Sequence, residues 1–298
     1  MKNVSIKIKE YDYKIYCLYH NKVYPKYYGD QIDRVTFVKM DKESYVFPAK
    51  NHIYLAKEKW FCPIGKEWAE YEFYYSLYKG YLAGQVELPE YLGFIHYDME
   101  FRSKEKKYSG MTVIDFIEEL IKKGKLNRAI LVSFNPESFI SIYKQNLNIF
   151  YTSGERAVYQ NCIDFFISHY NHLEKRSLKK KDLDDKNISI CGSFFIHRSV
   201  FLKMMGFLSK IIESHILEGY NKNKRTQGTF AERYVAIFLE ELRLDKIEFP
   251  LHHYFVASSG LRFDKNFFAK TNKIAGLIGK KIKYNFPREY NKLKRWLK

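Results

Sequence analysis

One short segment limits the folds open to this chain more than any other. Residues 91–97 read Y-L-G-F-I-H-Y, a nearly continuous apolar run that lacks the alternation of a half-exposed strand. Such a run is typical of a central strand in a parallel sheet, because helices cover both faces of that sheet. The run stops abruptly at Asp98-Met99-Glu100, so we expect a polar turn directly after a buried strand.

Strand-like and helix-like segments alternate along the rest of the chain. Further strands are predicted at residues 14–20, 34–39, 129–133, 188–196 and 247–249. Helices are predicted at residues 68–79, 112–123, 156–169, 199–215 and 229–242. Gly80 is the expected end of the first helix, and Thr112 with Asp115 the expected cap of the second. The alternation predicts an α/β fold with a mostly parallel central sheet flanked by helices.

Charge is distributed unevenly along the chain. The 298 residues hold 51 Lys and Arg against 34 Asp and Glu, a formal net charge of +17. Residues 270–298 contain ten Lys and Arg and one Glu, so this tail carries +9 and the other 269 residues about +8. An excess of positive charge is compatible with binding nucleic acid, an anionic membrane or a phosphorylated substrate, and also with the composition of an AT-rich genome. Because the excess is concentrated in the tail, we expect no nucleic-acid partner for the body of the chain.

The tail has apolar residues beside its basic ones. Residues 274–279 read I-A-G-L-I-G, and Trp296-Leu297 lie among basic residues near the end. This pattern is typical of a peripheral element on an anionic membrane surface, although a solvated basic tail fits it as well. No apolar run approaches the roughly 20 residues that span a bilayer. We therefore expect a cytoplasmic protein, peripheral on the inner face of the membrane.

Asp98 and Glu100 are the first candidates for chemistry. They lie two residues apart at the end of a predicted buried strand, and ligands of open α/β sheets bind beyond the carboxyl ends of strands. Two carboxylates at this spacing suit one hard divalent cation, Mn²⁺ or Mg²⁺, which in turn binds the phosphates of a nucleotide. Solvated acids at a strand end are the alternative interpretation.

Histidines supply a third ligand for such a cation. His252 follows the predicted strand at 247–249, and His20 and His96 lie near the ends of other strands. Mn²⁺ accepts imidazole as well as carboxylate, so we predict His252 as the ligand that joins Asp98 and Glu100. A hydrogen-bonded structural histidine is the alternative in each case.

Glu232 is the candidate base. Residues 225–234 read R-T-Q-G-T-F-A-E-R-Y and place Glu232 near the start of a predicted helix. A carboxylate there can accept a proton or bind a sugar hydroxyl. The pattern Thr229-x-x-Glu232 is also a capping box, so a purely structural role is an alternative. Arg225 and Arg233 suit neutralisation of a diphosphate.

Absent motifs narrow the choice of activity. The sequence holds no Walker A loop and no G-x-G-x-x-G, G-x-S-x-G or H-E-x-x-H pattern. This argues against P-loop NTPases, common Rossmann dehydrogenases, serine hydrolases with a nucleophile elbow, and zincins.

Four short motifs, in order, resemble a known group of proteins. They are the Glu-bearing helix W-A-E-Y-E-F-Y-Y-S-L-Y at 68–78, L-G-F-I-H-Y at 92–97, G-S-F-F-I-H-R at 192–198 and G-T-F-A-E-R at 228–233. This order is similar to bacterial capsule and O-antigen glycosyltransferase-like domains, a group long catalogued as a domain of unknown function. The resemblance covers roughly residues 13–255. Many members carry Arg after the H-Y motif, whereas this chain has Asp98-Met99-Glu100, which resembles the D-x-D metal motif of GT-A transferases.

The resemblance implies a GT-A fold and a metal-dependent glycosyltransferase of surface polysaccharide synthesis. Its donor is expected to be a nucleotide-diphosphate sugar and its acceptor a glycan or a lipid-linked sugar. The implied catalytic base is Glu232. The expected donor-binding residues are Tyr19 and His20 around the loop after the first strand, Glu70 and Tyr97 from the motifs, and the two arginines that suit a diphosphate, Arg225 and Arg233.

The chain is expected to form one GT-A domain at 1–269 followed by the basic tail at 270–298. The nucleotide-sugar half spans about 1–135 and the acceptor half about 136–269. A nucleic-acid-binding module and a non-catalytic scaffold of the same fold are the alternatives.

Overall fold

A computed structural model gives the architecture. It describes residues 12–20, 23, 29–41, 46–103, 105–108, 110–135, 140–141, 162–188, 192–217, 226–256 and 262–264. The basic tail, Arg225 and the first part of the helix predicted at 156–169 lie outside these residues. No helix among the described residues is long and apolar enough to cross a membrane.

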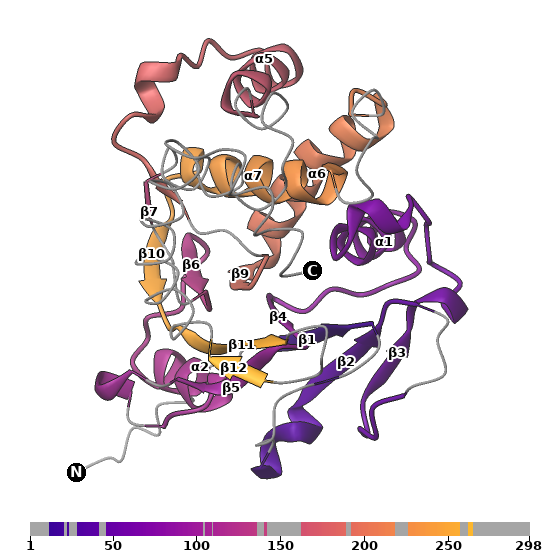
Figure 1. Ribbon diagram of the computed structural model, residues 1–298, viewed down its shortest axis with the longest axis vertical. Helices are drawn as coiled ribbons and strands as arrows, with labels where there is room; N and C mark the ends of the chain where they lie inside the picture. The colour runs from indigo at the N-terminus through magenta and orange to yellow at the C-terminus, as the bar shows by residue number, and fades with distance from the viewer. Residues whose placement is uncertain are drawn as a thin grey trace, which may run out of the picture.

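A seven-stranded sheet forms the centre of the molecule (Figure 1). Its order is β3 (His52–Tyr54), β2 (Val35–Lys39), β1 (Tyr13–Tyr19), β4 (Tyr91–His96), β9 (Phe194–His197), β6 (Ile130–Ser133) and β10 (Asp245–Glu248). All neighbours are parallel except β9, which runs antiparallel to both β4 and β6. The α/β fold with a mostly parallel sheet is therefore confirmed.

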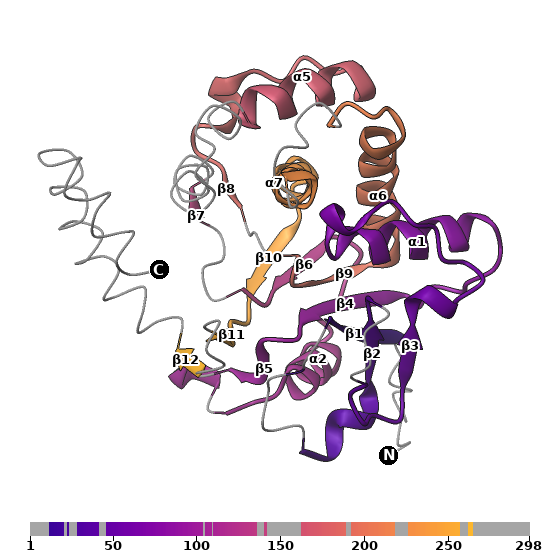
Figure 2. The same ribbon diagram turned by 45° about the vertical axis from the view of Figure 1, so that its right-hand side comes forward.

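Helices cover both faces of this sheet (Figure 2). One face carries α1 (Tyr71–Leu82), α5 (Cys162–Glu174), α6 (Arg198–Glu213) and α7 (Thr226–Glu241). The other carries α2 (Val113–Lys122) and a three-stranded sheet of β12 (Arg262–Asp264), β11 (Leu251–Val256) and β5 (Met99–Ser103). A two-stranded sheet joins β7 (Ile140–Ser141) to β8 (Asn187–Ile188). Short 3-10 helices are η1 (Gly29–Arg34), η2 (Leu55–Lys57), η3 (Lys66–Trp68), η4 (Lys106–Tyr108) and η5 (Lys180–Leu183).

The central strands divide the core between the two faces. Alternate residues of β4 point to opposite sides, so Phe94 belongs to the core under α1 and α6, and Ile95 to the core above α2. Residues 91–95 are all buried. The continuous apolar run at 91–97 thus reflects a strand covered on both faces, as the sequence indicates.

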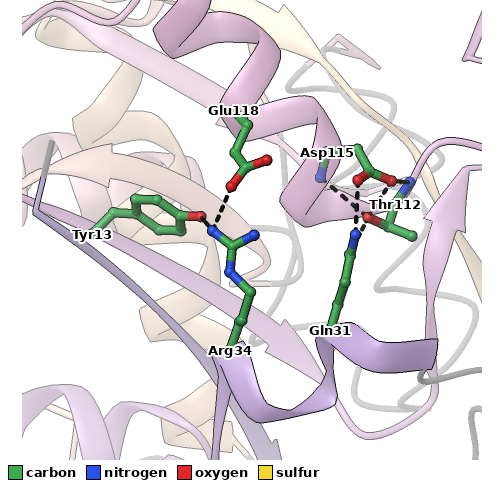
Figure 3. Close-up of polar contacts among 6 residues, drawn as sticks. All are labelled: Tyr13, Gln31, Arg34, Thr112, Asp115 and Glu118. Carbon is green, nitrogen blue, oxygen red and sulfur yellow. Dashed lines mark hydrogen bonds and ion pairs between the residues drawn. The ribbon is translucent and has the colours of Figure 1, made fainter. Parts of the chain in front are cut away.

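Helix α2 begins as its sequence predicts. Thr112 is the N-cap, and its hydroxyl oxygen accepts a hydrogen bond from the Asp115 amide at 3.1 Å. The Asp115 carboxylate accepts in return from the Thr112 amide at 2.9 Å. It also accepts from Gln31 of η1 at 2.7 Å (Figure 3). Burial raises the pKa of the Asp115 carboxyl, but the hydrogen bonds from Thr112 and Gln31 outweigh it, so the net pKa lies below its ordinary value.

A second contact joins the same elements. Arg34 at the end of η1 forms an ion pair with Glu118 of α2 at 2.6 Å and donates to the Tyr13 hydroxyl of β1. Helix η1 is therefore held against α2 at two points, and Arg34 also connects it to the first residue of β1.

Gly80 is not the end of α1. The helix continues to Leu82, and Gly84, with φ of +68°, follows its C-cap. Gly80 lies inside the helix because the helix packs closely there: a Cβ at this position would lie 2.8 Å from Cβ of Trp60. The predicted start is also shifted, since Trp68 belongs to η3 and α1 begins at Tyr71.

Asp115 makes the stability of the fold depend on pH. Its lowered pKa means that the ionised form stabilises the folded state above the ordinary carboxyl pKa of about 4, and that this stabilisation is lost as the pH falls. We expect Asp115→Asn to lower the free energy of unfolding at pH 7, with the gap to wild type closing towards pH 3. This difference in unfolding free energy is measured by urea unfolding between pH 3 and pH 7, monitored by circular dichroism. Asp164→Asn, which changes an exposed carboxylate in α5, is the control; a gap that stays constant with pH would contradict the assignment.

Candidate functional site

Three parallel strands end at the same edge of the sheet. β1 is flanked by β2 on one side and β4 on the other, and the chain passes from β1 to β2 before it returns to β4. This reversal is a topological switch point, the place where ligands of open α/β sheets bind beyond the carboxyl ends of the strands. The end of β1 brings Tyr19 and His20 there, and the end of β4 brings His96, Tyr97 and Asp98.

Tyr19 and His20 have different environments at this edge. The Tyr19 side chain is fully buried, and its hydroxyl lies 2.6 Å from Nε2 of His52 and accepts from the Phe47 amide at 3.3 Å. The His20 side chain is 45% exposed, with Nδ1 3.6 Å from the Asp41 carboxylate. Of these two predicted donor-binding residues, only His20 reaches solvent, while the Tyr19 hydroxyl bonds within the protein.

The turn after β4 is fixed to β1. The Tyr97 amide donates to the Leu18 carbonyl oxygen at 3.0 Å. Beside it, Oδ1 of Asp98 is buried and has no hydrogen-bond partner among the described residues. Burial raises the pKa of the Cys17 thiol, and the nearby Asp98 raises it further. Asp98 therefore directs a carboxylate oxygen into the protein at the switch point.

Glu100 and His252 belong to the small sheet. Glu100 lies in β5 and is 4% exposed. β11 pairs antiparallel with β5, with His253 opposite Met99 and Leu251 opposite Ser103, so the backbone of His252 runs beside the strand of Glu100. The side chain of His252 lies outside the described residues. Within the described ranges no three or more His, Cys, Asp or Glu side chains gather as a metal site, and the set of Asp98, Glu100 and His252 stays a prediction.

The first turn of α7 lies against η3, the segment just before α1. A Cβ at Gly228 of α7 would lie 3.0 Å from the carbonyl oxygen of Glu67 and 3.3 Å from that of Trp68, in the segment just before α1. Only glycine allows two backbones to approach this closely without displacement. The contact brings Glu70 and Tyr71, at the start of α1, near Glu232 and Arg233, which lie 161 positions or more away in the sequence.

Glu232 is not part of a capping box. Helix α7 begins at Thr226, so Thr229 lies inside the helix and cannot be its N-cap. The Glu232 carboxylate instead pairs with the Arg233 guanidinium, and both side chains are mostly buried. Nε of Arg233 is buried and has no hydrogen-bond partner in the described part of the chain. The capping interpretation, based on spacing alone, is therefore wrong.

Glu70 approaches the end of β4. Its Oε1 lies 4.0 Å from Nε2 of His96, and each side chain is about one-fifth exposed. Glu70 occupies the N-cap position of α1 but makes no capping hydrogen bond with its side chain. Its carboxylate is thus directed towards β4 rather than back onto its own helix.

Gly192 lies against the side chains of Glu70 and Tyr74. It has φ of +56°, and its carbonyl oxygen accepts a hydrogen bond from the Tyr74 hydroxyl at 2.8 Å. A Cβ here would lie 3.2 Å from Oε1 of Glu70 and 3.3 Å from the Tyr74 oxygen. The segment before β9 therefore lies directly on Glu70.

Tyr71 was not among the residues predicted from the sequence. Its side chain is fully buried, yet its hydroxyl has no hydrogen-bond partner among the described residues. Burial raises the pKa of Tyr71 well above its ordinary value, the charges of Glu70 and Glu232 raise it further, and Arg233 lowers it in part. In sequence, Tyr71 is one of several tyrosines in an aromatic helix, and nothing distinguishes it from its neighbours.

We use the name polar cluster for a set of residues from the starts of α1 and α7 and the end of β4. Its members are Glu70, Tyr71, His96, Glu232 and Arg233. The structure thus brings together three predicted site residues, Glu70, Glu232 and Arg233. Tyr19 and Glu100 are buried elsewhere, and Arg225 is outside the described residues.

Comparison with known proteins gives one informative likeness. No protein-family model matches the sequence, and no curated protein matches it. The apo structure of the WbbM bifunctional glycosyltransferase is similar, with a TM-score of 0.51 and 17% sequence identity. The similarity covers 80% of this chain and 44% of that chain, so this chain spans less than half the length of that protein. The likeness shows a glycosyltransferase-like α/β fold.

Gly192 is expected to be sensitive to substitution for two separable reasons. Gly192→Ala would place an L-residue in left-handed backbone, which costs about 1–2 kcal/mol, and would crowd Glu70 and Tyr74 as well. Gly124→Ala is the matched control, because Gly124 has φ of +62° and open space where the Cβ would lie. Chemical denaturation should show a larger loss of unfolding free energy for Gly192→Ala. Equal losses would show that the contact with Glu70 does not constrain this position.

Proposed function

We propose that this protein is a glycosyltransferase that moves a sugar from a nucleotide-diphosphate sugar to a glycan or lipid-linked acceptor in surface polysaccharide synthesis. The observation that carries the proposal is the polar cluster at the carboxyl edge of a sheet whose fold resembles that of WbbM. His96 joins the two parts of this edge, because it lies 4.0 Å from Glu70 and two residues before Asp98.

Transfer forms a bond between an acceptor oxygen and the anomeric carbon and breaks the bond from that carbon to the diphosphate. In a transfer that inverts the anomeric centre, a carboxylate accepts the proton of the acceptor hydroxyl. We assign this role to Glu232, which the adjacent Arg233 holds in place through their ion pair. The proposed base is thus a carboxylate on α7, a helix that packs against one face of the sheet.

The donor is assigned to the switch point. The exposed His20 and the turn at Tyr97 lie at the ends of β1 and β4, where a nucleotide is expected in this class of sheet. Tyr19, Glu70, Arg225 and Arg233 complete the proposed donor set. In this set the buried Tyr19 stabilises the end of β1, since its hydroxyl bonds to His52 and to the Phe47 amide.

Mn²⁺ or Mg²⁺ is the proposed cofactor. Asp98, Glu100 and His252 would hold it, and the buried, unpaired Oδ1 of Asp98 is the observation that fits a cation among the described residues. When bound, such an ion neutralises charge that develops on the departing diphosphate. We also propose that the tail at 270–298 brings the protein to the inner face of the cytoplasmic membrane, near a lipid-linked acceptor.

The proposal predicts donor binding that depends on metal and on Asp98. Thermal-shift measurements with UDP-, GDP-, dTDP- and CMP-sugars, each with and without Mn²⁺, should reveal one stabilising nucleotide class. Asp98→Asn should keep the melting temperature of the free protein and abolish the increment that Mn²⁺ adds. Stabilisation that persists unchanged in EDTA would exclude the metal assignment, and no stabilisation by any nucleotide sugar would exclude the proposed function.

Glu232 is expected to be required for transfer but not for folding. Glu232→Gln removes the proton acceptor, so we expect transfer to fall about 10²- to 10⁴-fold while the donor still stabilises the protein. The assay follows radiolabelled sugar from the donor found by the screen into an organic extract of bacterial membranes. Glu241→Gln, at the other end of the same helix, is the control; equal activities of the two variants would remove Glu232 from the mechanism.

A further inference from the structure

The hydroxyl of Tyr71 is a buried polar group that the proposed reaction does not use. Buried phenolic hydroxyls usually have a partner, because leaving one unpaired away from water is unfavourable. The rest of the Tyr71 ring packs in the core and meets the Tyr74 ring edge to face, with centroids 5.3 Å apart. Packing therefore explains the position of the ring, but it does not explain why the hydroxyl has no hydrogen-bond partner among the described residues.

The neighbours of this hydroxyl provide several further polar atoms. The carboxylates of Glu70 and Glu232 and the guanidinium of Arg233 are all close enough to act on Tyr71. Two more nitrogens, Nε of Arg233 and Nε2 of His96, are buried and lack hydrogen-bond partners in the ranges described. Both hydrogen-bond donors and acceptors therefore lie near Tyr71.

The cluster has access to solvent. Between 14% and 20% of each of the side chains of Glu70, His96, Glu232 and Arg233 is exposed, whereas Tyr71 is fully buried. Tyr71 is thus the fully buried member of the cluster, and the other four are partly exposed. A ligand that approached from solvent would contact these four side chains first.

The charges of the cluster limit what this ligand can be. Two carboxylates face one guanidinium, which is already paired with Glu232. An anionic substituent on the sugar ring itself would be repelled by Glu70 and would compete with Glu232 for Arg233, whereas the diphosphate of the donor is assigned to the switch point. Neutral hydroxyl groups, which both donate and accept, match this mixture of donors and acceptors instead.

We infer that the polar cluster binds the hydroxyl groups of a neutral sugar ring, with the Tyr71 hydroxyl and Nε of Arg233 donating to it and the Glu70 carboxylate accepting from it. The inference deepens the proposed function, on which it rests, by naming the substrate class: a neutral sugar, rather than a uronic or sialic acid. The raised pKa of Tyr71 supports it, since the hydroxyl keeps its proton and remains a donor.

Saturation-transfer NMR on the full-length chain tests this directly. The probes are free D-glucose, D-galactose, D-mannose, L-rhamnose and N-acetylglucosamine, with D-glucuronic and D-galacturonic acid as acidic counterparts. We expect saturation transfer to at least one neutral sugar and none to the acids. Tyr71→Phe should lower the affinity for the neutral sugar about five- to tenfold, which is the loss expected for one hydrogen bond. Tyr75 lies on the same helix as Tyr71, and its hydroxyl donates to Glu213 of α6, so Tyr75→Phe should leave binding unchanged.

Thermal stability separates a ligand-binding role from a structural one. Removing an unpaired buried hydroxyl should leave the melting temperature of Tyr71→Phe equal to or above that of wild type. A melting temperature lowered by several degrees, preferred binding of the acids, or no saturation transfer to any neutral sugar would each overturn the inference. These probes carry no nucleotide. The sugar-binding test can therefore succeed even if the nucleotide-sugar screen fails, and the two failures can be told apart.

Discussion

The pairing of β1 with β4 is the contact on which the rest of the structure depends. The two strands run parallel in register from Tyr13 opposite Tyr91 to Leu18 opposite His96, and residues 15–19 and 91–95 are buried on both faces. Their shared carboxyl edge is the topological switch point. Because each face needs its own helical cover, this pairing also requires the two layers of helices, and it determines where the turn carrying Asp98 leaves the sheet.

The second constraint is the close approach of backbones around α1. Gly228 lets the first turn of α7 lie on the segment before α1, and Gly192 lets the chain before β9 lie on Glu70. Side chains from three distant parts of the sequence then meet beside β4. The carboxylates of Glu70 and Glu232, the Arg233 guanidinium and the Tyr71 hydroxyl share a partly buried environment, where polar interactions are stronger than in water. Such an environment suits binding and proton transfer.

Local signals predicted the features that depend on local interactions. Thr112 and Asp115 form the expected capping box because both of its hydrogen bonds lie within four residues. Gly80 and Thr229 were misinterpreted, since their roles depend on neighbours elsewhere in the chain: Gly80 makes room for Trp60, and α7 begins three residues before Thr229. Glu70, Glu232 and Arg233 were named from motifs, but their meeting was not predictable from spacing. Tyr71 carried no signal at all, because a tyrosine within an aromatic helix resembles a core residue.

The sequence by itself determined the class of fold, the doubly covered strand at 91–97 and the acidic turn after it. These depend on apolar periodicity, which each segment shows independently of the others. Only the tertiary structure decided which polar side chains share a site and which are bonded within the protein, as with the hydroxyl of Tyr19 and that of Tyr71. The reason is physical: whether a polar group is satisfied depends on which atoms surround it, and those atoms come from segments brought together only when the sheet and its helices pack.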